Sequence, residues 1–326
     1  MHTLLRRDLL GAACLLAFAT GASAQAQNYP SNPIRFVAPT GPGSPPDVIS
    51  RIAATGLSAR AGWRVVVENR PGGLQMVAVA DVLKQPADGH SILAMAVPTL
   101  AAQALLPHLG LRLDADFVPV IKFATGYNVL VVNTSVPATS VSELVALLKS
   151  RPDKFNFASG GFGTPAHLIG EMFKLKTGTR AVHVPYPQAQ QRISDLLSGV
   201  TQFSFLASSL SAELVASGKL RALAVTGPKR VDALKDVPTI IEQGFPELVV
   251  EDWTGFGVRS GTPGEIVARL NEALNKALTQ QDVREALARF GYEPVGGTAT
   301  EFGALIKSQL AHWDTVIRES GIKMPQ

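Results

Sequence analysis

Cysteine is nearly absent from this chain of 326 residues, which has one example, Cys14. A disulfide framework and a thiolate metal site are therefore excluded. Aromatic residues make up only 6 %, and 30 basic side chains stand against 26 acidic ones, a formal net charge of +4. So small an excess argues against a nucleic-acid partner, because neutralising many phosphates needs a concentrated basic surface.

Long apolar runs are also missing. The run Leu9–Ala19 is about 11 residues long, well short of the roughly 20 that span a bilayer as a helix. It follows Arg6-Arg7 and precedes Ala22-Ser23-Ala24, which is the order of parts in a secretory signal peptide. We therefore predict a signal peptide at residues 1–24, read by the general secretory or the twin-arginine route. Its removal would leave a periplasmic protein without cysteine.

The rest of the chain has a globular composition, with 46 % hydrophobic and 17 % charged residues. Its length favours two domains over one. Short β-rich runs alternate with helical patterns, and this alternation predicts an α/β fold. The expected strands are Ile34–Pro39, Arg64–Val67, Ser91–Met95, Phe117–Phe123, Asn128–Val132, Phe155–Ala158, Arg180–Val184, Thr201–Phe205 and Leu220–Val225.

Several helix starts are marked by Ser or Thr three residues before an acid, the spacing of a capping box. Pro45 and Pro263 are expected at the first helical position, where no N–H group is missed. The expected boxes are Ser44 with Asp47, Ser140 with Glu143, Thr262 with Glu265, and Thr298 with Glu301.

The common enzyme signatures are absent from the sequence: GxSxG, HExxH, the Walker phosphate loop and the EF-hand loop. The histidines are scattered singly and no spacing suggests a metal site. Gly161, Gly163 and Ala166 satisfy a dinucleotide fingerprint, but the acid expected about 20 residues later is missing. We therefore expect no cofactor and no metal.

Two glycine-containing loops each link a strand to a helix: loop 1, Pro39–Asp47, and loop 2, Ala158–His167. Glycine removes the Cβ atoms that would keep a ligand from the backbone, and a helix start offers unpaired N–H groups at a positive dipole end. Either loop alone is explained equally well by tight turns in which Ser44 and Thr164 cap their own helices. The recurrence of the pattern in both halves favours an anion site.

The candidate ligand-binding residues lie in these loops and in a third strand-to-helix segment, Val184–Gln188. There Tyr186 could present its hydroxyl and ring to a ligand, or be a half-buried core residue. The candidates are Thr40, Gly41, Gly43, Ser44 and Asp47 in loop 1, Ser159, Gly161, Gly163, Thr164 and His167 in loop 2, and Tyr186.

An ordered series of segments resembles the Bug receptors, which are the receptors of tripartite tricarboxylate transporters. The series is Tyr29-Pro30, Pro33-Ile34-Arg35, loop 1, Val65–Arg70, Pro86–His90, Asp116–Val120, Ala158–Leu168, His183–Tyr186 and Pro238-Thr239. The resemblance implies a periplasmic solute-binding protein with the two-lobed Venus flytrap fold, similar to the type II class. It also implies that the strand-to-helix loops hold a small carboxylate in the cleft between lobes, through backbone N–H groups and hydroxyls.

The chain departs from the family pattern beside the expected cleft. Loop 1 reads Pro42-Gly43-Ser44-Pro45-Pro46-Asp47, where the family usually has P-G-G-x-T-D. The glycine-rich stretch after Arg70 is shortened to Pro71–Leu74. Gln188 stands where family members often have a glycine after the Pro-Tyr-x segment. These departures leave the fold unchanged and the identity of the ligand open.

We predict two lobes: lobe 1, residues 28–123 plus 248–326, and lobe 2, residues 124–247. Two chain crossings would then act as a hinge. The expected function is capture of a small organic carboxylate by a monomer and its delivery to the membrane permease subunits of a tripartite tricarboxylate transporter.

Two other functions stay open. One is a secreted hydrolase or transferase acting on a carboxylate ester, using Ser159 or Ser44 with His167 or His183. The sequence places no carboxylate to orient such a histidine, which disfavours it. The other is the ligand-sensing half of a transcription regulator, against which the signal peptide and the lack of DNA-reading helices count.

We predict that export removes residues 1–24, because the small residues at Ala22 and Ala24 suit signal cleavage. The mature protein should begin at Gln25. N-terminal sequencing of protein recovered outside the cytoplasm measures this start. A cytoplasmic chain that still begins at Met1 would contradict the prediction.

Overall fold

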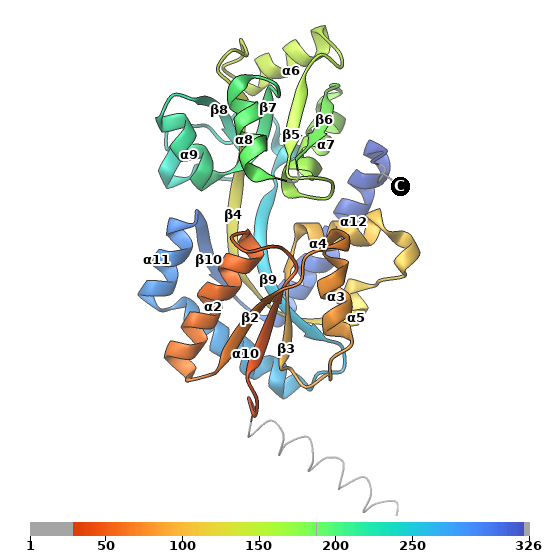
Figure 1. Cartoon of the computed structure of the whole chain (residues 1–326), viewed down its shortest axis with the longest axis vertical. Helices are drawn as coiled ribbons and strands as arrows, with labels where there is room; N and C mark the ends of the chain where they lie inside the picture. The colour runs from red at the N-terminus through yellow and green to blue at the C-terminus, as the bar shows by residue number, and fades with distance from the viewer. Residues whose placement is uncertain (1–28, 187, 323–326) are drawn as a thin grey trace, which may run out of the picture.

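The computed structural model describes residues 29–186 and 188–322. The predicted signal peptide and Cys14 lie outside the described residues. Two lobes follow one another along the long axis of the molecule (Figure 1). None of the helices in these two stretches combines the length and the apolar character that a membrane span needs.

Lobe 1 holds a mixed sheet in the order β2-β1-β3-β9-β4, with β10 also paired to β4. β1 is parallel to β2 and β3, whereas β9 is antiparallel to β3. The strands wholly in this lobe are β1 (Ile34–Ala38), β2 (Val65–Asn69), β3 (Ser91–Ala96), β9 (Glu251–Arg259) and β10 (Tyr292–Gly296). The helices are α2 (Pro45–Ala61), η1 (Gly73–Gln75), α3 (Met76–Leu83), α4 (Val97–Leu105), η2 (Pro107–Leu109), α5 (Leu113–Asp116), α10 (Gly264–Leu278), α11 (Gln281–Arg289) and α12 (Ala299–Ser320).

Lobe 2 continues the same sheet in the order β4-β7-β5-β6, with β8 on the other side of β4. β5 is parallel to β6 and β7, and β4 is antiparallel to β7 and β8. The strands are β5 (Asn156–Ser159), β6 (Val182–Pro185), β7 (Phe203–Ala207) and β8 (Leu220–Val225). The helices are α6 (Val141–Ser150), α7 (Pro165–Thr177), α8 (Ala189–Ser198), α9 (Ser208–Ala216), η3 (Asp232–Leu234) and η4 (Pro246–Leu248).

The strand shared by both lobes is β4 (Phe117–Asn133). The sequence predicted two strands here, Phe117–Phe123 and Asn128–Val132, and this was wrong, because one strand of 17 residues runs through. Its residues up to Tyr127 pair with β9, and those from Asn128 onward pair with β7. The division into residues 28–123 with 248–326 and residues 124–247 stays a prediction. The point at which β4 changes its partner from β9 to β7, between Tyr127 and Asn128, lies close to the predicted boundary at residue 124.

Two strands of lobe 1, β9 and β10, were not predicted. Glycines interrupt the apolar pattern of β9, and the packing explains them. A Cβ atom on Gly255 would lie 2.3 Å from the ring of Phe302, and one on Gly257 would lie 2.8 Å from Sδ of Met95. Glycine in this strand therefore allows close approach of neighbouring side chains instead of marking a turn.

Thr226 joins the two crossings between the lobes. It lies directly after β8, is 1 % exposed, and its backbone N–H donates to the carbonyl of Asn128 (2.8 Å). Its hydroxyl accepts from the N–H of Asn128 (3.1 Å) and donates to the carbonyl of Val250 (2.9 Å), the residue before β9. One side chain thus fastens both strands of the hinge at the same level.

Three apolar cores stabilise the structure. One lies within lobe 1 under α2 and α10, and another lies within lobe 2 between β4 and α9. The third runs through both lobes, because α12 contacts α4 in lobe 1 and α7 in lobe 2. Trp313 of α12 is buried in this shared core.

Local helix signals were correct at about half of the predicted starts, and the boxes expected at Ser44 with Asp47 and at Thr262 with Glu265 were wrong. Thr298 and Glu301 form the predicted capping box of α12, and the hydroxyl of Ser140 accepts from the N–H of Glu143. Pro45 is the first residue of α2. The start of α10 was wrong by one residue: Pro263 is its N-cap, and Thr262 instead donates its hydroxyl proton to the carbonyl of Arg259.

We predict opposite effects for one substitution at two buried hinge threonines. Thr226→Val leaves a buried N–H and a buried carbonyl without their hydroxyl partner, and should lower the free energy of unfolding by about 1–3 kcal/mol. Thr254 in β9 is equally buried, and its hydroxyl has no partner among the described residues, so Thr254→Val should be neutral or stabilising. Urea unfolding measures both, and equal losses would contradict the role given to Thr226.

Candidate functional site

Loop 1 and loop 2 each form a turn, and the two turns have the same hydrogen-bond pattern. The hydroxyl of Ser44 donates to the carbonyl of Gly41, and that of Thr164 to the carbonyl of Gly161, both at 2.7 Å. Gly43 and Gly163 each precede the hydroxyl residue with a φ of 82° and 73°, in the left-handed region that glycine enters without strain. A proline then begins the helix in each case.

These hydroxyls do not cap their own helices. Ser44 and Thr164 are the N-cap residues of α2 and α7, as predicted, but neither side chain bonds a helix N–H group. Their protons go to the glycine carbonyls, which leaves lone pairs of each oxygen directed elsewhere. The reading in which both residues serve only as caps therefore lacks the hydrogen bond on which it depends. In lobe 1 the hydroxyl of Thr40 lies 2.5 Å from that of Ser44.

The third residue of each helix closes the turn, and here the loops differ in charge. The N–H of Gly43 donates to Oδ2 of Asp47 (2.9 Å), and the N–H of Gly163 donates to Nδ1 of His167 (3.1 Å). The same backbone geometry is therefore closed by a carboxylate in lobe 1 and by an imidazole in lobe 2.

Asp47 is 2 % exposed and its oxygens are already engaged. Besides the bond from Gly43, they accept from Nε of Arg51 (3.0 Å) and Nδ2 of Asn69 (2.8 Å). Burial alone would raise the pKa of this carboxyl, but the bonds from Arg51, Gly43 and Asn69 together hold it below its usual value. Asp47 is thus an ionised group that holds loop 1 in place.

His167 and His183 lie against each other behind loop 2, with ring centroids 4.3 Å apart and ring planes tilted by 38°, and Phe162 packs against both. Burial, then the neighbouring His183 and Lys174, lower the pKa of His167 to about 3. Burial and then Lys174 lower the pKa of His183 to about 4. Both rings are neutral at pH 7 and add no charge to the loop. Within the described residues, no three potential ligands converge on a metal position.

Ser159 lies against His183, with Oγ 2.6 Å from Nε2. This is one of the serine and histidine pairs that a hydrolase would need. The serine side chain, however, is fully buried, and its oxygen also accepts from the N–H of Gly161 (3.0 Å). No acid bonds to His183 among the residues described. A nucleophile must reach its substrate, and this serine is enclosed by its own loop.

Tyr186 is 8 % exposed and joins the third segment to loop 2. Its N–H donates to the carbonyl of Ser159, and its hydroxyl donates to Oδ2 of Asp195 (2.8 Å). Burial, with Asp195 beside it, raises the pKa of Tyr186 to about 12. The hydroxyl proton is therefore already used within lobe 2.

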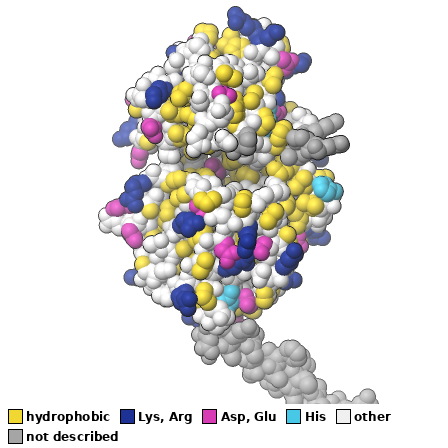
Figure 2. Space-filling model, viewed as in Figure 1, with side chains coloured by type: hydrophobic (Ala, Val, Ile, Leu, Met, Phe, Trp, Pro, Cys, Tyr) yellow, Lys and Arg dark blue, Asp and Glu magenta, His cyan; other side chains and the backbone are white. Residues whose placement is uncertain are grey.

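The two loops face each other across the space between the lobes. Loop 1 lies on the side of lobe 1 turned towards lobe 2, and a recess separates the lobes in the space-filling view (Figures 1 and 2). Leu74 of η1 reaches over this space: its Cδ2 is 3.0 Å from the point where a Cβ atom on Gly163 would lie. Leu74 and Gln75 hold left-handed backbone angles, with φ of 52° and 75°. Such strain is characteristic of functional segments.

Comparison with known proteins assigns the chain to a family. Residues 49–322 match the tripartite tricarboxylate transporter family receptor, TctC. The UPF0065 protein in the tcbD-tcbE intergenic region of Pseudomonas sp. strain P51 is 34 % identical over 96 % of this chain and 94 % of its own length. The chain belongs to the tripartite tricarboxylate transporter receptor family. Protein BugT of Bordetella pertussis is 33 % identical to this receptor, over 93 % of this chain and 94 % of its own.

Solved structures similar to this receptor confirm the predicted two-lobed fold. A periplasmic transporter is 35 % identical with a TM-score of 0.80, covering 90 % of this chain and 99 % of its own. An R. palustris protein solved with adipate is 31 % identical with a TM-score of 0.79, at the same coverage. MatC of Rhodopseudomonas palustris, with bound malate, is 27 % identical with a TM-score of 0.78, covering 89 % of this chain and 100 % of its own.

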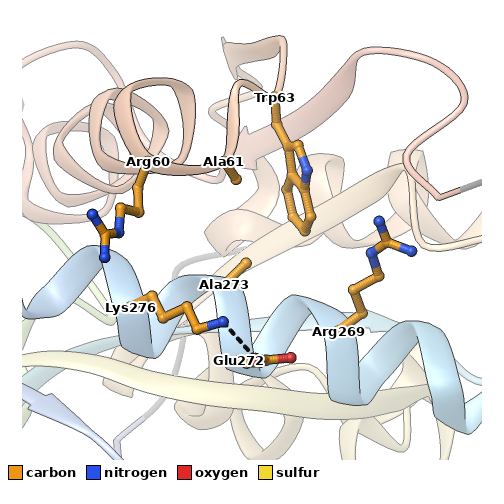
Figure 3. Close-up of a pocket in the computed structure, with 7 residues that line it drawn as sticks. All are labelled: Arg60, Ala61, Trp63, Arg269, Glu272, Ala273 and Lys276. Carbon is orange, nitrogen blue, oxygen red and sulfur yellow. Dashed lines mark hydrogen bonds and ion pairs between the residues drawn. The ribbon is translucent and has the colours of Figure 1, made fainter.

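A second hollow of this receptor lies away from the two loops. It has a volume of about 330 Å³ and lies between the end of α2 and the surface of α10, with Lys276 and Glu272 paired in its wall (Figure 3). Loop 1 is at the opposite end of α2, and 17 helical residues separate the ends by about 25 Å. The residues that line it are Arg60, Ala61, Trp63, Arg269, Glu272, Ala273 and Lys276.

Sequence reasoning did not select three residues that shape the site. Asn69 bonds both the carbonyl of Thr40 and Asp47, and its position within Glu68-Asn69-Arg70 was a usable signal. Leu74 and Arg192 had no such signal, because a leucine and a helical arginine are common everywhere. Their places beside loop 2 follow only from the packing of distant segments.

We predict that alanine is tolerated differently at the matching glycines of this receptor. Gly43→Ala and Gly163→Ala both put a Cβ atom on a left-handed residue, at a cost of about 1–2 kcal/mol. Only the Cβ atom of Gly163→Ala would also meet Leu74. At Gly43 no atom of the described residues lies within 4 Å of the point where the Cβ atom would be. Urea unfolding should therefore show a greater loss for Gly163→Ala, by about 1–3 kcal/mol. When Leu74→Ala is present as well, the two glycine variants should lose the same free energy of unfolding. If Gly163→Ala loses as much with Leu74→Ala as without it, Leu74 does not contact Gly163 across the lobes.

Proposed function

We propose that this receptor captures a small organic carboxylate in the cleft between its lobes and presents it to a membrane permease. The observation that carries the proposal is the repeated turn: one copy from each lobe, facing the other across the space in which a ligand would lie. A ligand bonded to both turns stabilises the closed arrangement over the open one, because only closure brings both turns within reach.

The chemistry of the turns favours an anion. Each turn lies at the positive end of a helix dipole, which favours an anion over a cation. Prolines, which have no N–H group, take the first two positions of α2 and the first of α7. The helix-start N–H groups that no described residue accepts from are those of Asp47 in lobe 1 and of Ala166 and His167 in lobe 2.

In this proposal Ser44 and Thr164 turn their hydroxyl protons from the glycine carbonyls to the ligand when it binds, and Thr40 contacts it through its hydroxyl. Gly41, Gly43 and Gly161 let it approach the backbone, whereas Leu74 and Leu105 occupy the space beside Gly163, which keeps loop 2 in shape.

The remaining candidates take a positioning role in the proposal. Asp47, Ser159, His167 and Tyr186 have their polar atoms engaged within their own lobes. They hold the turns in shape, so that the N–H groups are oriented before a ligand arrives. Preorganised donors cost less on binding than donors that must first be ordered.

Adipate and malate in the related structures support a carboxylate as the ligand class. We further infer that the protein works in the periplasm as a monomer, after removal of its signal peptide, and that its partner is the permease of a tripartite tricarboxylate transporter. Family membership supports this partner, since the family consists of transporter receptors.

The hydrolase alternative retains one supporting observation, the contact between Ser159 and His183. The burial of Ser159 counts against it, because the nucleophile would have to leave its loop to attack an ester. Incubation with methyl esters of adipate and malate separates the two functions. Release of the acid by the parent protein, abolished in Ser159→Ala, would support the hydrolase.

We predict that Ser44→Ala and Thr164→Ala each weaken binding of a carboxylate by roughly ten- to a hundredfold, the worth of one hydrogen bond to a charged group. Ser140→Ala is the matched control: it removes a helix cap in lobe 2, worth about 1 kcal/mol of stability, without touching the loops. Screening dicarboxylates by thermal shift and then titrating by calorimetry gives the affinities. Unchanged affinity in both loop variants would leave the loops as turns only.

A carboxylate at a hundred times its dissociation constant should stabilise the parent protein by about 2.7 kcal/mol. Diamides of the same length should not, because they lack the charge that the helix starts favour. If a diamide protects as well as its acid, the anion reading of the cleft is wrong.

A further inference from the structure

Arg192 lies beside loop 2, at the end of the first turn of α8. Its Nη1 is 3.5 Å from the point where a Cβ atom on Gly160 would be, and Oγ1 of Thr164 is 3.9 Å from the same point. Because Gly160 has no side chain, the guanidinium and the hydroxyl of Thr164 border one small space. The guanidinium therefore belongs to the surroundings of loop 2, although its helix comes later in the chain.

The guanidinium of Arg192 has no partner among the described residues. No hydrogen bond or ion pair reaches its side chain, and its Nε is buried. Asp195, three residues along the same helix, would be the ordinary partner for an arginine at this spacing. Its carboxylate is engaged instead by the hydroxyl of Tyr186 (2.8 Å) and by Nε2 of Gln191 (2.7 Å).

Two physical effects make this placement costly in the free protein. Arg192 is half-buried with its Nε enclosed, and a cation partly removed from water without a counter-ion loses hydration that nothing in the described part of the chain replaces. The first turn of a helix is its positive end, which repels a cation. In keeping with the first effect, burial lowers the pKa of Arg192. No described residue offsets this free-energy cost of placing the Arg192 guanidinium, which points to an anionic ligand as its partner.

The two lobes differ in what they offer an anion. Next to loop 1 lies the ionised carboxylate of Asp47, whose charge is shared with Arg51. Next to loop 2 lie two neutral imidazoles and the unpartnered guanidinium. A carboxylate is therefore better accommodated on the lobe 2 side, even though the two turns have the same backbone geometry.

We propose that Arg192 is the specificity-determining residue of the cleft, donating hydrogen bonds to the ligand carboxylate that loop 2 holds. This inference rests on the proposed function and adds to it an orientation and a selectivity. One carboxylate of the ligand lies against lobe 2, beside the positive charge of Arg192. The other end meets loop 1 through N–H groups and hydroxyls only.

The test is a cycle of two changes, one in the protein and one in the probe. Arg192→Gln removes the charge, and Arg192→Lys keeps it but loses the planar fork. Arg180→Gln is the matched control, because Arg180 is an exposed arginine of lobe 2 that pairs with Asp153 at the surface. The probes are adipate and malate, each compared with its monoamide and diamide, titrated by calorimetry at fixed salt.

We expect Arg192→Gln to weaken binding of the acids by roughly ten- to a hundredfold, the effect of a charged hydrogen bond. The same variant should change diamide binding by less than about threefold, since a diamide brings no charge to lose. Arg192→Lys should fall in between, and Arg180→Gln should match the parent protein.

Melting temperature without ligand separates recognition from a structural role. Removing an unpartnered, half-buried cation should leave Arg192→Gln at least as stable as the parent protein. An arginine that merely supports the fold would give the reverse, with a lower melting temperature and unchanged selectivity between acid and amide. That reverse result would overturn the inference.

The remaining outcomes distinguish this inference from the proposed function. If an acid binds the parent protein and Arg192→Gln equally well, the role of Arg192 is wrong and the carboxylate receptor stands. If no acid of the series binds the parent protein, the proposed carboxylate class fails and the inference fails with it. An acid that loses affinity in Arg192→Gln while its diamide does not supports both.

Discussion

The single strand β4 constrains everything else in this receptor. Its first part hydrogen-bonds to β9 and β10 in lobe 1, and its second part to β7 and β8 in lobe 2. The lobes therefore cannot slide along one another without breaking a ladder, and bending is the motion left to them. Thr226 ties the return segment to β4 at the point of exchange. The two turns are placed opposite each other by this continuous strand, because each follows a strand of the sheet that β4 completes.

Equal backbone geometry with unequal charge is the main property of the site. The turns share the bond from hydroxyl to glycine carbonyl and the bond from glycine N–H to the third helical residue. What varies is the group that receives this last bond, Asp47 or His167. A ligand with two similar ends could lie in the cleft in either direction as far as the turns are concerned. The charges around the turns differ, with the carboxylate of Asp47 beside one and the guanidinium of Arg192 beside the other, and the role proposed for Arg192 would give such a ligand one orientation.

The sequence predicted the parts of this fold that depend on neighbours along the chain. Glycine, a hydroxyl residue and proline in succession revealed both turns, and the prolines fixed the starts of α2 and α7. Strand β9 was missed because Gly255 and Gly257 serve contacts with Phe302 and Met95, which are distant in sequence. Leu74, Thr226 and Arg192 escaped for the same reason, since their importance arises from segments that meet only after folding. Asp47 was correctly placed in loop 1, but its enclosure by Arg51 and Asn69 could not be read from spacing.

The apolar core that α12 carries from one lobe into the other makes the two sides of the hinge unlike. On the side of α12, side chains of α4, β4 and α7 pack into one continuous body, whereas on the other side each lobe has a core of its own. Separating the lobes on the α12 side would expose buried apolar surface, and on the other side it would not. The lobes are therefore held together by shared apolar packing along the α12 side. Opening the lobes on the side away from α12 exposes less apolar surface than opening them on the α12 side, and the packing of α12 sets the direction in which the lobes can part.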